Sequence, residues 1–136
     1  MTCTTELMIE LNLIFDNDYN VYQISNIIDL LPVQCQNRNE TRINPITNQQ
    51  NPGYWSFSTG YIETLDFEMV SMSFINKLRP FLPKIQQILY ENGGEAYICV
   101  VLKIKNGRTP ILGINKELME VALQLKCDID FDLYVN

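Results

Sequence analysis

Residues 5–15 read TELMIELNLIF, and in this stretch apolar side chains occupy every second position. Successive side chains of a β-strand point to opposite faces of the sheet, so this alternation predicts a strand with one buried face. The predicted buried set is Leu7, Ile9, Leu11, Leu13 and Phe15. Glu6, Met8, Glu10 and Asn12 alternate with them and are expected on the other face.

Two later segments have strand character as well. Residues 96–105 are rich in β-branched side chains, and residues 128–135, DIDFDLYV, alternate with period two. The shared periodicity predicts one buried sheet face formed by Leu7, Ile9, Leu11, Ile98, Val100, Leu102, Phe131 and Leu133. The helices expected to cover this face carry Phe74, Leu78, Ile85, Ile88 and Leu118.

Helical spacing of apolar residues recurs in three regions. Residues 21–31 form the first, which Pro32 stops. Residues 67–91 form the second, and Arg79-Pro80 divides it into two helices because a residue before proline avoids the helical region. The third follows Asn115, a residue type that caps helix N-termini.

The remaining segments are turns and short strands. Residues 34–52 are rich in amides and predict a loop with a short edge strand, and residues 54–59 return to β-prone types. Asn106-Gly107 favours a tight hairpin turn, which predicts a partner strand at 109–114. The resulting order is β-α-β-β-α-α-β-β-α-β. We therefore expect a single α+β domain over residues 1–136, with a largely antiparallel sheet and helices packed on one face.

Composition argues against several kinds of chemistry. The 136 residues include no histidine, which removes the usual general base and the commonest metal ligand. Cys3, Cys35, Cys99 and Cys127 are widely spaced, so we expect free thiols, no metal site and no cofactor. Cys99 and Cys127 lie in apolar patterns and are expected to be small buried residues. No catalytic residues are predicted.

The chain carries a net charge of −6, which repels nucleic acid and anionic lipid and attracts basic partners. Plain solubility explains such a charge equally well. The N-terminal residues lack signal-peptide features and no apolar run is long enough to span a bilayer, so a cytoplasmic location is expected.

The layout resembles the bacterial domain-of-unknown-function family 4279. The resemblance rests on the N-terminal strand and the helix ending at Leu31-Pro32, on Gly53-Tyr54-Trp55, on Leu78-Arg79-Pro80, and on residues 118–134. The chain departs from the family at Lys126-Cys127, where a glycine-containing turn is expected, and in an amide-rich insertion at 44–51. The resemblance implies the fold and a bacterial origin, but no activity.

The candidate binding residues are five carboxylates: Glu6, Glu10, Asp128, Asp130 and Asp132. If the first and last strands are neighbours, these side chains form one acidic patch that steers a basic protein. A straight row of aspartates does not converge on a metal ion. The other interpretation is a solvated face balanced by Lys103 and Lys105.

Trp55 is the single tryptophan, and burial with one hydrogen bond is the favoured interpretation for it. The favoured function is a non-enzymatic binding protein for a basic protein, for example an immunity protein against a toxin such as a nuclease. The alternative is an enzyme or small-ligand-binding protein that uses carboxylates and amides around residues 34–52. The oligomeric state is left open.

Overall fold

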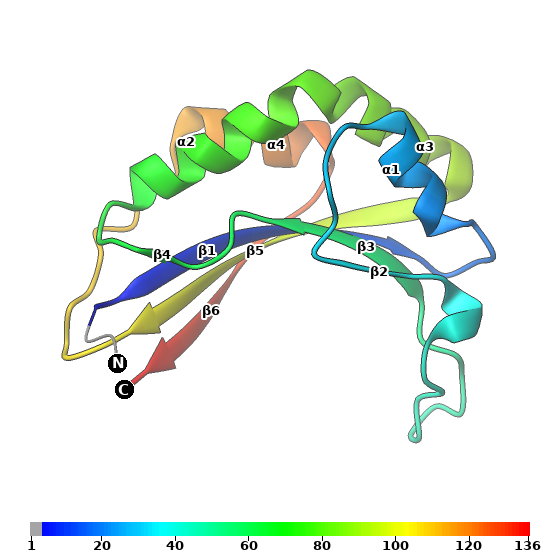
Figure 1. Cartoon of the computed structure of the whole chain (residues 1–136), viewed down its shortest axis with the longest axis horizontal. Coiled ribbons are helices and arrows are strands. Elements are labelled where there is room, and N and C mark those ends of the chain that lie inside the picture. Colours follow the sequence, from blue (N-terminus) through cyan, green and yellow to red (C-terminus); the bar gives the residue numbers. More distant parts are fainter. Residues whose placement is uncertain (1–3) are drawn as a thin grey trace.

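The structure, a computed structural model, describes residues 4–136 and is built on one sheet (Figure 1). The strands are β1 (Glu6–Phe15), β2 (Gln34–Gln36), β3 (Gly53–Ser58), β4 (Ile62–Glu63), β5 (Gly94–Ile104) and β6 (Ile129–Val135). Their order is β2-β3-β1-β5-β6, with β4 paired to the start of β1. All pairings are antiparallel except that of β5 with β6.

The helices are α1 (Ile24–Ile27), α2 (Phe67–Leu78), α3 (Leu82–Asn92) and α4 (Lys116–Gln124). Single turns of 3-10 helix occupy Val21–Gln23, Arg38–Glu40 and Arg79–Phe81. All four α-helices lie on the same side of the sheet (Figure 1), so the predicted α+β class is confirmed. Within residues 4–136, no helix is both long and apolar enough to cross a bilayer.

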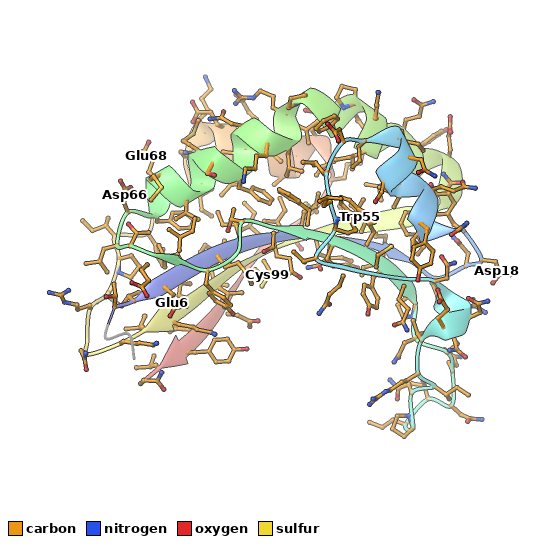
Figure 2. All side chains as sticks on the ribbon, in the orientation of Figure 1. Glu6, Asp18, Trp55, Asp66, Glu68 and Cys99 are labelled. Carbon is orange, nitrogen blue, oxygen red and sulfur yellow. The ribbon has the colours of Figure 1, made fainter. Side chains whose placement is uncertain are left out.

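The core lies between the sheet and the helices. Every predicted inward residue of β1 is fully buried, and residues of β3, β5 and the four helices pack against them. Trp55 is among these, and its indole N–H donates to the Ser25 hydroxyl at 3.1 Å. Figure 2 shows Trp55 on the helix side of the sheet, which confirms the structural role predicted for it.

The helix boundaries follow the local signals. The Asp66 side chain caps α2 by accepting from Met69 N–H at 3.1 Å, and the Asn115 side chain caps α4 through Leu118 N–H at 2.8 Å. The predicted division at Arg79-Pro80 is present as a 3-10 turn between α2 and α3. At the departure from the family pattern, Lys126 has a φ of 54°, the left-handed conformation that glycine adopts most readily.

The predicted strand at 109–114 is wrong, although its turn is present. Asn106 and Gly107 both have positive φ, and Arg108 N–H donates to Lys105 O at 3.1 Å, as the turn requires. However, β1 and β6 already occupy the two sides of β5. Since no free edge is left beside β5, residues 109–114 instead run as an irregular connection to α4.

The first predicted helix is much shorter than residues 21–31. It ends at Ile27, and Leu31 is 86% exposed. Val33 N–H donates to Ser56 O at 2.8 Å, so the chain must already be extended when it reaches the edge of β3. The two-residue strand β4 has no periodic pattern and was not predicted.

The predicted burial of Phe131 and Leu133 is also wrong. The register places them beside Val100 and Leu102, on the helix side as expected. They are nevertheless 43% and 58% exposed. The reason is position: β6 ends the sheet, and no strand follows it among residues 4–136 to complete the covering on that side.

Candidate binding face

No helix or strand of residues 4–136 covers the face of the sheet opposite the helices. Figure 1 shows that the sheet bends, with this face on the inside of the bend. The alternate residues of β1, β5 and β6 supply its side chains, and Figure 2 shows Glu6 and Cys99 on this side. We call it the open face.

The strand register fixes how the predicted carboxylates lie on the open face. Glu10 pairs with Cys99, and Cys99 pairs with Asp130, so the three form one row across β1, β5 and β6. The condition that the first and last strands are neighbours is therefore not met. Two strand spacings, roughly 9–10 Å, separate the backbones of Glu10 and Asp130. The open face holds both acidic strands, but β5 lies between them.

The lysines do not balance the aspartates in the way considered from the sequence. Lys105 Nζ lies 3.4 Å from Glu6 Oε1, and both side chains are largely shielded from solvent. Lys103 Nζ lies 3.9 Å from the ring centroid of Tyr61. Both cations thus have other partners, and Glu6 is the most neutralised of the five carboxylates.

Asp128, Asp130 and Asp132 are exposed, and no lysine or arginine within residues 4–136 forms an ion pair with them. Asp132 Oδ2 accepts a long hydrogen bond of 3.8 Å from Cys99 Sγ. Among the described residues, 4–136, no three Cys, Asp or Glu side chains converge as metal ligands would. The row is a line of negative charge along the edge of the open face.

Cys99 and Cys127 are only partly buried, which corrects the expectation of small buried residues. Burial, followed by the nearby Asp132 carboxylate, raises the pKa of Cys99 to about 11. Burial and then Asp128 raise the pKa of Cys127 to about 11. Both thiols therefore stay protonated near neutral pH and are poor nucleophiles. Cys35 is also a free thiol, whereas Cys3 lies outside the described residues.

These pKa values predict slow alkylation of the folded protein. At pH 8 a pKa of about 11 instead of 9.0 makes the thiolates of Cys99 and Cys127 roughly 100-fold scarcer. Their higher basicity restores part of the reactivity, so we expect rates roughly tenfold below those of the unfolded chain. Iodoacetamide labelling followed by mass spectrometry measures each site. Equal rates in folded and urea-unfolded protein would contradict the raised pKa values.

The backbone at the outer edge of β6 is a feature that sequence reasoning missed. Asp128 O accepts from Ile98 N–H at 3.4 Å, and Asn136 N–H donates to Ile104 O at 3.0 Å. Backbone N–H and C=O groups of successive residues point to opposite sides of a strand. The even-numbered residues of β6 therefore form the hydrogen bonds to β5. The outward-facing backbone groups are those of Ile129, Phe131, Leu133 and Val135. No sequence signal identifies this edge, because it depends on the order of the strands.

Two surface hollows lie near the predicted loop and near Asp128. The amide-rich segment is folded on itself, with Asn44 N–H donating to Gln49 O at 2.7 Å and Asn51 N–H to Arg42 O at 3.0 Å. A hollow of about 410 Å³ beside it is lined by Ile14, Gln36, Thr41, Arg42, Asn51, Pro52 and Tyr54. Asp128 lines the other, of about 440 Å³, with Tyr97 and Cys127 among its neighbours.

The fold and its open face define an α+β domain. The chain belongs to the family described as Domain of unknown function (DUF4279), whose model matches residues 5–136. The resemblance seen in the sequence is thereby confirmed over nearly the whole chain. No curated protein and no solved structure matches it.

Proposed function

We propose that this is a non-enzymatic binding protein whose open face receives a basic protein partner. The observation that carries the proposal is the row Asp128, Asp130 and Asp132, exposed and without a cationic partner among residues 4–136. Glu10 extends the negative charge inward from this row through the Cys99 position. Glu6 contributes least, because Lys105 already neutralises it.

Charge supports a protein partner with a basic surface. Exposed carboxylates that no lysine screens create a local negative field, which speeds the encounter with a cation and disfavours nucleic acid. An immunity protein that neutralises a basic toxin, such as a nuclease, is the example that we favour. A cytoplasmic, bacterial setting is part of the proposal. The free thiols Cys35, Cys99 and Cys127 support a reducing compartment.

The test is the double substitution Asp130→Lys/Asp132→Lys. A partner is first isolated by affinity capture from the native host, and association is then followed by stopped flow at several salt concentrations. We expect association to slow by roughly tenfold at low salt and its salt dependence to weaken, because steering is screened over about 8 Å at physiological ionic strength.

The matched control is Glu91→Lys/Glu120→Lys, which makes the same change in net charge at exposed helical positions on the covered side of the sheet. A local acidic interface predicts a much smaller effect of this control. If both double variants slow association equally, net charge alone is responsible and the open face is not the interface.

One observation favours a second candidate, a small-ligand-binding protein. The hollow beside residues 34–52 presents Gln36, Arg42 and Asn51, which suit a ligand with hydrogen-bonding groups. No carboxylate lines this hollow, so it gives no support to the enzymatic version of the alternative. Substituting Arg42 by Ala would remove binding of such a ligand without affecting a partner on the β6 side.

A further inference from the structure

We propose that the partner adds a strand to the outer edge of β6, which no strand of residues 4–136 occupies, through an extended segment in which basic and apolar residues alternate. The inference rests on the proposed function and specifies how the partner is held. Its elements are the outward backbone groups of β6, the aspartates on one side of that edge and exposed apolar side chains on the other.

The backbone supplies the first element. Ile129, Phe131, Leu133 and Val135 turn both N–H and C=O away from β5, as the bonds at either end of β6 require. Such an edge accepts an extended chain through main-chain hydrogen bonds, a mode in which alternate side chains then determine specificity. The seven residues of β6 offer four consecutive bonding positions to that chain.

The side chains of β6 supply the other two elements, which are the aspartates and the exposed apolar groups. Asp130 and Asp132 lie on the open face, whereas Phe131 and Leu133 lie on the helix side, where both are substantially exposed. A residue directly opposite another on a neighbouring strand presents its side chain to the same face. An incoming strand therefore meets carboxylates on one face and apolar groups on the other, which selects a segment with lysine or arginine at every second position and apolar residues between.

The same charges disfavour a second copy of this chain as the occupant. Antiparallel pairing of two β6 strands, edge to edge, would bring the aspartate rows of both copies onto the same face and close to each other. Like charges opposite one another destabilise strand pairing. A basic strand relieves this repulsion, so charge complementarity points to a cationic segment.

The probe is the peptide Lys-Val-Lys-Val-Lys-Val-Lys, blocked at both ends, with binding measured by fluorescence anisotropy. The matched peptide Lys-Lys-Lys-Lys-Val-Val-Val has the same composition and charge without the alternation. We expect the alternating peptide to bind at least about tenfold more tightly, since only it satisfies several edge hydrogen bonds together. Two further versions carry N-methyl groups on the lysines or on the valines. Only one of these should lose binding, because alternate N–H groups face β6.

The edge itself is tested with Leu133→Pro. Leu133 N–H points outward, so proline removes an edge donor and spares the bonds to β5. The matched variant Leu133→Ala loses the side chain and keeps the N–H. We expect the proline variant to bind the alternating peptide several-fold more weakly than the alanine variant. Thermal unfolding of both variants checks that the overall fold is retained.

The outcomes separate this inference from the proposed function. Asp130→Asn/Asp132→Asn should weaken every cationic peptide. If it does, while the permuted peptide binds as tightly as the alternating one, the acidic surface stands and strand addition is refuted. If the aspartate substitutions change nothing, the proposed function fails as well. Dimers of the free protein in sedimentation that disappear in Leu133→Pro would show that a second copy occupies the edge, and would overturn the inference.

Discussion

Phe74→Ala is expected to lower the free energy of unfolding by about 3–5 kcal/mol. Phe74 lies on α2, is 0% exposed and stacks on Phe57 of β3 with ring centroids 6.3 Å apart. Truncating it leaves a cavity between the helix layer and the sheet that the surrounding side chains cannot fill. Urea denaturation followed by circular dichroism measures the change.

Phe131→Ala is the matched control for this loss. Full burial of Phe131, as the sequence predicts, would imply a cost of about 3–5 kcal/mol. At 43% exposure that condition fails, and we now expect roughly 1 kcal/mol. A larger loss for Phe131 than for Phe74 would mean that β6 is covered in solution and that the sheet does not end there.

Gly94→Ala is the second substitution with a large expected effect, about 1–3 kcal/mol of destabilisation. Gly94 pairs with Phe15, and a Cβ built on it would lie within 3 Å of several atoms of the Phe15 ring. The ring cannot move aside easily, because it is fully buried and lies 4.8 Å from the Tyr19 ring centroid. The cause is lack of space. Thermal and chemical unfolding both report the loss.

Gly113→Ala serves as the control, since nothing lies within 4 Å of a Cβ at that position. It should change stability by no more than about 0.5 kcal/mol. A smaller residue in place of Phe15 provides a second check. In Gly94→Ala/Phe15→Leu the two effects should be clearly less than additive, since the substitutions share one contact. Full additivity would argue against the proposed clash.

Much of this fold was predictable because local chemistry and tertiary structure agree in most segments. The alternation in β1 identifies its buried face residue by residue, and Pro80 and Asn115 mark helix boundaries where the structure has them. These signals depend on residues close together in the sequence, so a neighbouring strand seldom changes the local structure that they specify.

The wrong predictions share one physical cause. The periodicity of a segment does not show which strands or helices lie next to it in the fold. Asn106-Gly107 forms its turn, yet no strand follows because β5 has no vacant side. Alternation assigns Phe131 to the helix side, but burial depends on what lies over β6. The candidate site was predictable to the same extent. The aspartates share a face as predicted, but their distance from Glu10 follows from the position of β5 between β1 and β6.

The central position of β1 has a consequence for how the chain acquires its structure during synthesis. β1 is synthesised first, but it pairs with β5. Glu6, for example, lies opposite Lys103, which is added to the chain 97 residues later (103 − 6). Until β5 is synthesised, β1 can pair only with earlier strands such as β3, and only the earlier helices can cover its apolar face. Folds dominated by such distant pairings form slowly, and their nascent forms expose surfaces that aggregate or engage chaperones. The residues that make the finished sheet stable are thus the ones that make the growing polypeptide vulnerable.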